Sequence, residues 1–264
     1  MSEPQFIRIH VSLLSVDIAV QRSTDPHRAA KMAGEFDIDK AGTLIVNQRA
    51  NGQYSVIDGG HRLLAAQLAE YDGELNCLVH QFLPIETEAK LFLALNDSKL
   101  VQAIDKFRVR VVAHDEIAIS INETLTSHGW RAAPGSTAGN FSAVAALERV
   151  SAGAGVLDDN KHHPELVEAT LFAITRAWGH EVDGAHGAIV GGLGQLFARY
   201  GARVDTKKLV HEMSKRRPVD LVTKARTIKE AQGGNVPAAM AKVLVGIHNT
   251  QRRKNLLPEW QWIR

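Results

Sequence analysis

The sequence has a single cysteine, Cys77, among its 264 residues, so it cannot form an internal disulfide. Such a chain suits the reducing cytosol, and we expect a cytoplasmic protein. The first residues, MSEPQFIRIH, include no apolar signal core, and no hydrophobic run is long enough to span a membrane. The most apolar stretch, residues 187–197, is too short and contains Gln195. We therefore expect neither a membrane span nor a membrane partner.

Several common catalytic motifs are also missing. The stretch GGLGQLF at 191–197 does not continue into Gly-Lys-Ser/Thr, which excludes a P-loop and favours close helix packing as the role of its glycines. The sequence contains neither G-x-S-x-G nor H-E-x-x-H, the motifs of α/β-hydrolases and zinc proteases. The pair His162-His163 has no cysteines or acids at metal-ligand spacing, so we interpret it as part of an exposed loop.

Charge is distributed unevenly along the chain. The net charge is only +2, but residues 201–264 contain 14 Lys and Arg against 5 Asp and Glu, a net charge of +9, which leaves −7 for the first 200 residues. A basic region of this kind is typical of proteins that contact nucleic acid, and 203–254 is the candidate DNA-binding region. Solvated faces of several helices explain the same pattern, so both interpretations stay open.

Hydrophobic periodicity predicts strands and helices in the first part of the chain. Residues 6–13 alternate as a half-buried strand does, and two strands within 43–58 are joined by Asn51-Gly52, a strong hairpin signal. Asp25-Pro26 predicts the cap and first residue of a short helix that ends near residue 36. A further strand, LNCLVHQF, is followed by an amphipathic helix, IETEAKLFLALND.

Beyond about residue 101 the chain reads as a series of helices interrupted by two loops. We therefore predict an α+β fold, with a mixed-sheet domain over residues 1–115 and an all-helical domain over 116–264.

The stretch SVIDGGHRLLAA, residues 55–66, joins a strand to a helix through two glycines and places His61 and Arg62 at the corner. Glycines at such a turn allow positive φ and a close approach of the backbone. The first N–H groups of a helix have no internal partners, and an arginine beside them suits a phosphate or carboxylate. On the motif alone, a purely structural corner is the alternative.

Four more residues extend this corner toward a triphosphate site. Arg22 precedes the first helix, and Asn96 and Lys99 follow the helix that contains Glu88. Cations, backbone donors and an oxygen ligand are what a triphosphate with Mg²⁺ requires. Glu88 lies about two turns before Asn96 and is a candidate second metal ligand or a base, with an ordinary surface glutamate as the alternative.

The order of these elements, with VQR before the first helix, YSVIDGGHRLLAA after a hairpin and LALNDSK later, resembles the ParB/sulfiredoxin-like family over roughly residues 6–115. The resemblance implies a ParB/sulfiredoxin-like mixed-sheet domain that binds nucleotide phosphates. It places Gly60 and Arg62 at the glycine and first arginine of the ParB Gly-Glu-Arg-Arg corner. It likewise places Asn96 at the metal-binding asparagine, Lys99 at a later arginine and Arg22 at an early arginine.

The chain departs from that family pattern at several positions. His61 replaces the glutamate, Leu63 the second arginine and Leu95 the acid before Asn96. No cysteine stands between Gly60 and His61, which excludes the sulfinic-acid reduction of sulfiredoxins. The Asp-Gly-x-His-Arg form is closer to free-serine kinases and to DGQHR-type proteins of DNA-modification gene clusters. The whole chain also resembles phage and mobile-element proteins described as ParB-like nucleases.

The expected function is that of a Mg²⁺-dependent nucleoside triphosphatase that uses ATP or CTP in a DNA-related process. Asp58, His61 and Arg62 are the predicted catalytic residues, and Asn96 and Glu88 the predicted metal ligands. The predicted phosphate-binding residues are Arg22, Gly59, Gly60, His61, Arg62 and Lys99. Three alternatives stay open: a nucleotide-sensing DNA-binding module with little turnover, a small-molecule kinase with Glu35 or Glu88 as base, and a DNA nuclease. A homodimer is compatible with each of them.

Overall fold

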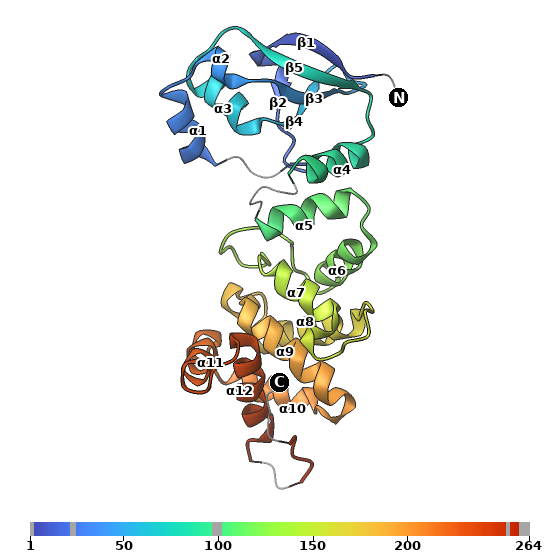
Figure 1. The fold of residues 1–264 in the computed structure, drawn as a ribbon. Coiled ribbons are helices and arrows are strands. Elements are labelled where there is room, and N and C mark those ends of the chain that lie inside the picture. The colour runs from blue at the N-terminus through green and yellow to red at the C-terminus, as the bar shows by residue number, and fades with distance from the viewer. Residues whose placement is uncertain (1–2, 22–24, 97–101, 252–253, 259–264) are drawn as a thin grey trace. The chain divides into compact units, whose positions relative to one another are not determined.

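The computed structural model describes residues 3–21, 25–96, 102–251 and 254–258 (Figure 1). The chain divides into two compact units, Met1–Asp115 and Glu116–Arg264. The first unit contains a five-stranded sheet with helices, and the described part of the second is built from helices without a sheet. The structure therefore confirms the predicted α+β class.

The sheet of the first unit is mixed, with strand order β1-β5-β3-β4-β2. Its strands are β1 (Gln5–His10), β2 (Leu14–Ser15), β3 (Leu44–Gln48), β4 (Tyr54–Asp58) and β5 (Glu74–Gln81). The pairs β1–β5 and β3–β4 are antiparallel, whereas β3–β5 and β2–β4 are parallel. The turn between β3 and β4 contains Asn51-Gly52 as predicted, and Gly52 adopts a φ of 83°.

Helices cover both faces of the sheet. Successive strand residues point to opposite sides, and apolar residues on each side pack against helices. On one face, β-strand residues such as Val46 and Val56 pack with Leu63 of α3 (Gly60–Leu68) and Ala41 of α2 (Ile38–Ala41). On the other face, Ile57 packs with residues of α4 (Ile85–Leu95) and α5 (Ala103–Val112). Strand β4 therefore contributes to both apolar layers, Val56 to one and Ile57 to the other.

Helix α1 (Pro26–Ala33) begins as predicted at Asp25, whose carboxylate accepts hydrogen bonds from the N–H groups of His27 at 3.0 Å and Arg28 at 3.4 Å. The helix ends at Ala33 rather than near residue 36, because the chain turns at Gly34 and starts the unpredicted helix α2. Helix α1 packs against α3.

The second unit packs its helices around α9 (Gly187–Tyr200). The other described α-helices are α6 (Glu116–Ser127), α7 (Val144–Ser151), α8 (Pro164–Trp178), α10 (Thr206–Ser214), α11 (Pro218–Gln232) and α12 (Val236–Asn249). A Cβ atom at Gly192 would overlap Met240 of α12, and one at Gly194 would overlap Val150 of α7. These glycines therefore allow the close helix packing that the sequence predicted.

One interpretation of the sequence was wrong for this unit. His163 is only 8% exposed, and its ring nitrogens lie 2.9 Å from carboxylate oxygens of Asp159 and Glu165. The His162-His163 pair is therefore not simply an exposed loop, because these two acids compensate the burial of the second imidazole.

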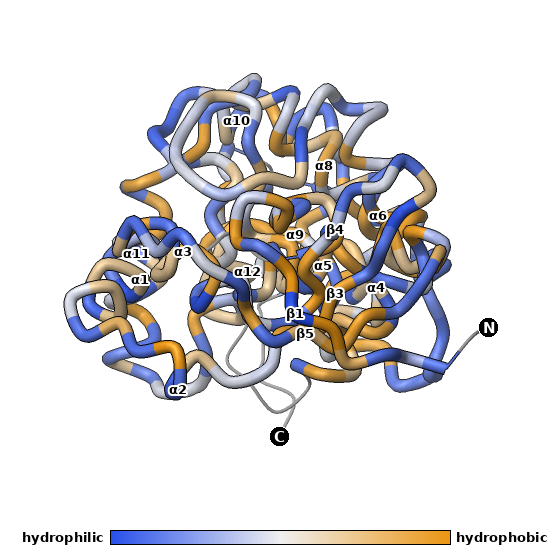
Figure 2. Tube along the Cα trace, turned by 90° about the horizontal axis from the view of Figure 1, so that it is seen from above, coloured by the Kyte–Doolittle hydropathy of each residue, from blue (hydrophilic) through white to orange (hydrophobic). Residues whose placement is uncertain are grey.

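The hydropathy view shows short hydrophobic stretches broken by hydrophilic residues (Figure 2). Among the described residues, no helix is both long and apolar enough to cross a bilayer.

Candidate functional site

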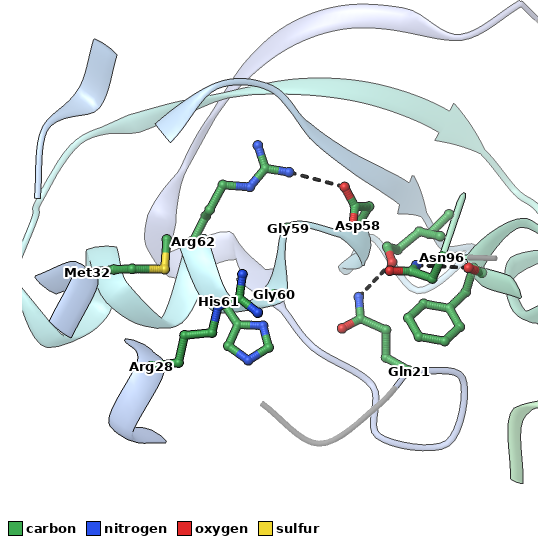
Figure 3. A pocket seen from close by; sticks show the side chains of 11 residues that line it. Gln21, Arg28, Met32, Asp58, Gly59, Gly60, His61, Arg62 and Asn96 are labelled. Atoms are coloured by element: carbon green, nitrogen blue, oxygen red, sulfur yellow. Dashed lines mark hydrogen bonds and ion pairs between the residues drawn. The ribbon is translucent and has the colours of Figure 1, made fainter. Parts of the chain in front are cut away.

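A cavity of about 500 Å³ lies at the point where β4 ends and α3 begins (Figure 3). Its lining combines the apolar side chains of Met32, Ile57 and Phe92 with polar and charged residues. It is lined by Gln21, Arg28, Met32, Ile57, Asp58, Gly59, Gly60, His61, Arg62, Phe92 and Asn96. The structure thus brings together the predicted residues Asp58, Gly59, Gly60, His61, Arg62 and Asn96.

The turn itself requires glycine at position 59. Gly59 adopts a φ of 104°, and a Cβ atom there would lie 2.9 Å from both Nη2 of Arg62 and Cγ of Leu44. The helix that follows has no side-chain cap at this residue. Backbone N–H groups at such a helix start, together with the positive end of the helix dipole, favour an anion.

Arg62 is engaged with the protein itself. Its Nη1 donates to the carbonyl oxygens of Ala41 at 2.9 Å and Thr43 at 3.0 Å, and its Nη2 lies 3.2 Å from Oδ2 of Asp58. The guanidinium therefore ties the start of β3 to the end of β4, next to the glycine turn. Asp58 is positioned by the same contact (Figure 3).

His61 connects α3 to α1. Its Nε2 accepts a hydrogen bond of 3.0 Å from the backbone N–H of Asp25. Because a backbone N–H can only donate, Nε2 carries no proton in this arrangement, and the neutral ring has its proton on Nδ1. His61 therefore fixes the first turn of α1 beside the first turn of α3.

Arg28 is a cavity residue that the sequence analysis did not identify. It lies in the first turn of α1, it is exposed, and its side chain makes no hydrogen bond or ion pair with the described part of the chain. In the sequence it is one cation among several in a short helix. Its relation to the glycine turn depends on the contact between α1 and α3, for which the sequence carries no local signal.

Two buried amides, Gln21 and Asn96, line the cavity with their oxygens available. Gln21 is 4% exposed, and its Nε2 donates to the carbonyls of Val56 and Ile57, the latter at 2.9 Å. Asn96 is 2% exposed, and its Nδ2 donates to the carbonyl of Phe92 at 2.9 Å. Within the described part of the chain neither amide oxygen receives a hydrogen bond, so each can accept one from a ligand or bind a cation.

Glu88 is not among the residues that line the cavity. Its side chain is 1% exposed and forms a bidentate ion pair with Arg49, at 2.9 Å from Nε and 2.7 Å from Nη2. Asn47 and Ser55 also donate to its carboxylate, at 2.6 and 3.2 Å. Both oxygens are therefore satisfied by the protein, which favours a structural role over the predicted metal-binding one.

The remaining predicted residues, Arg22 and Lys99, lie outside the described residues. Among the described residues, no group of three or more His, Cys, Asp or Glu side chains is arranged to hold a metal ion. A cation at this cavity would therefore depend on amide oxygens and on oxygens of the ligand itself.

The fold and the cavity define an α+β protein with a candidate anion site at a strand–glycine–helix turn. Residues 18–261 match the family of unknown function DUF6551, and the chain belongs to that family. Among solved structures, the chain is similar to the C-terminally truncated chromosome-partitioning protein ParB from Caulobacter crescentus complexed with CTP-gamma-S. That similarity has 12% identity and a TM-score of 0.28, and it covers 74% of this chain and 97% of the other. A comparison with curated proteins found no match.

Proposed function

We propose that the N-terminal unit is a ParB-like nucleotide-binding module that holds ATP or CTP with Mg²⁺ in the cavity after β4. One observation carries the proposal: a cavity of about 500 Å³ is lined by the start of α3, by the amides of Gln21 and Asn96, and by Arg28, whose side chain has no partner among the described residues. The volume lies within the range of small-molecule sites. The sequence resemblance to the ParB/sulfiredoxin-like family supports the same ligand.

In this proposal the phosphates lie at the start of α3, where backbone N–H groups and arginine compensate their charge. Asn96 would help to hold Mg²⁺ through its amide oxygen, because magnesium in nucleotide sites relies on few protein ligands and on the phosphates. Asp58 and His61 are positioning residues in this proposal. Asp58 orients Arg62, and His61 holds the start of α1 beside the start of α3, where the phosphates bind. Hydrolysis would then follow from positioning and charge neutralisation.

The first test is isothermal titration of nucleotide-free protein with ATP, CTP and GTP in Mg²⁺. We expect one of the first two to bind at a ratio of one per chain, and its affinity to fall when EDTA removes Mg²⁺. Asn96→Leu should lose most of the Mg²⁺ dependence, whereas Asn76→Leu, on β5, should keep it. Absence of binding by all three nucleotides would overturn the proposal.

Turnover is tested separately by phosphate release from the nucleotide that binds. Release that requires Mg²⁺ and is lost in His61→Ala, which removes the acceptor of the Asp25 N–H, would support a nucleoside triphosphatase. Tight binding without release would support the alternative of a nucleotide sensor with little turnover. A kinase finds less support, because Asp58 is the only carboxylate among the described lining residues and it is paired with Arg62.

A DNA-binding role of the second unit is the second candidate function. Helices α10 and α11 are joined by only three residues, and Lys224 and Lys229 lie exposed on α11. The cations of the connection are paired, however: Lys215 and Arg216 with Glu212, and Arg217 with Asp220. DNA affinity that falls steeply with salt and weakens in Lys224→Gln/Lys229→Gln would support this role, and a flat salt response would contradict it.

A further inference from the structure

The cavity is lined by two described arginines that differ in what their guanidinium groups contact. Arg62 donates to two backbone carbonyls and pairs with Asp58, and its side chain is 26% exposed. Arg28 is exposed and makes no hydrogen bond or ion pair with the described part of the chain. The motif around the glycine turn points to Arg62 as the anion ligand, whereas the geometry distinguishes Arg28.

The backbone of Arg28 is held in place, although no described residue holds its side chain by a hydrogen bond or ion pair. The carboxylate of Asp25 caps the N–H groups of His27 and Arg28, and the N–H of Asp25 is bound to Nε2 of His61. Arg28 therefore extends from a helix start that is fixed to the first turn of α3. Figure 3 shows its guanidinium at the same end of the cavity as His61.

We propose that Arg28 is the residue that binds the anionic group of the ligand, and that Arg62 is a positioning residue that keeps the glycine turn in shape. A ligand that recruited Arg62 would have to replace its contacts with Ala41, Thr43 and Asp58. A ligand that recruits Arg28 breaks no contact within the described part of the chain. A free guanidinium therefore contributes its charge-assisted hydrogen bonds in full.

The assignment deepens the proposed function, since it names the residue that reads the phosphates. The assignment can also be tested without a nucleotide, because Arg28 and the start of α3 would bind the phosphate groups and not the base. Inorganic pyrophosphate is therefore the second probe, beside the nucleotides. It separates a failure of the nucleotide proposal from a failure of this assignment.

The experiment measures affinity and thermal stability of four purified proteins: wild type, Arg28→Gln, Arg62→Gln and Lys31→Gln. Lys31 is the matched control, because it is an exposed cation of the same helix and does not line the cavity. We expect Arg28→Gln to weaken pyrophosphate and nucleotide binding by about tenfold or more at unchanged melting temperature. Lys31→Gln should bind as wild type does, and Arg62→Gln should melt at a lower temperature without ligand.

Each other outcome decides a different question. Equal affinities of Arg28→Gln and Lys31→Gln overturn the assignment, as does an Arg62→Gln protein that melts like wild type and alone fails to bind. If wild type binds pyrophosphate but none of the nucleotides, the proposed function is wrong. The pyrophosphate affinities of Arg28→Gln and Lys31→Gln then decide the Arg28 assignment. If wild type binds neither probe, both are wrong.

Discussion

Arg49 holds the buried carboxylate of Glu88 in a two-point contact, Nε to Oε1 at 2.9 Å and Nη2 to Oε2 at 2.7 Å. A third donor of Arg49, Nη1, reaches Asp17 at 2.8 Å. Hydrogen bonding to Glu88 raises the pKa of Arg49 against the opposing effect of burial. For Asp17, hydrogen bonds from Ala19 and Arg49 outweigh burial and lower the pKa. The cluster therefore connects the end of β3 to α4 through Arg49 and Glu88.

Removing Arg49 should destabilise the protein strongly, because the buried carboxyl group of Glu88 would lose its two-point partner. We expect Arg49→Leu to lower the free energy of unfolding by about 3 kcal/mol, as for other buried pairs that lose one member. Urea denaturation measures this. The matched control is Arg8→Leu, whose pair with Glu74 is exposed and 3.6 Å long, with an expected change below about 1 kcal/mol. Similar small changes in both variants would contradict the prediction.

His163 should make stability depend on pH. Carboxylate oxygens of Asp159 and Glu165 lie 2.9 Å from its two ring nitrogens, and hydrogen bonding to Asp159 and then to Glu165 raises the pKa of the imidazole above its ordinary value. A group whose pKa is raised in the folded state stabilises the protein when it is protonated. This contribution to the free energy of unfolding is complete below the unfolded-state pKa of about 6.5, and it is lost as the pH rises through the folded-state pKa.

The melting temperatures of wild type and His163→Gln test this between pH 5 and 9. The difference between the two proteins should be largest at the acid end and should shrink with rising pH. A difference that stays constant over the range would show that His163 does not act through its charge.

Two glycines of the second unit should respond to alanine in opposite directions. At Gly194 a Cβ overlaps Val150, so Gly194→Ala should destabilise by about 1–3 kcal/mol. At Gly246, exposed in α12, a Cβ meets nothing within 4 Å, and alanine should stabilise by about 0.5–1 kcal/mol through helix propensity. Thermal melts of both variants measure these changes as shifts in melting temperature. A lower melting temperature of Gly246→Ala would contradict the packing described for α12.

Cys77 should be unreactive in the folded protein. The residue is 1% exposed, and burial raises the pKa of its thiol to about 11, so little thiolate exists at pH 8. A colorimetric thiol reagent should label it slowly in buffer and rapidly in urea. Fast labelling of the native protein would place this strand in a different environment.

The parts of the fold that rest on local chemistry could be predicted from the sequence. Asp25-Pro26 starts α1 and Asn51-Gly52 turns β3 into β4, because each effect involves neighbouring residues. For Glu88 the sequence predicts a metal ligand or a base, with a surface glutamate as the alternative. The surface alternative is wrong, because the side chain is buried with Arg49, which is 39 residues away in the sequence. Arg62 is likewise occupied by carbonyls about 20 residues away in the chain, which no motif reveals.

Helix α1 forms one side of the candidate site and buries few of its residues. Ala29 is its one buried residue, whereas α3 buries Gly60, Leu63, Ala65 and Ala66. Local opening requires less free energy where little apolar surface is buried, so amide hydrogens of α1 should exchange with deuterium well before those of α3. A ligand held by Arg28 would slow that exchange in α1 selectively, which makes occupancy of the site visible as a change in isotope uptake confined to one short helix.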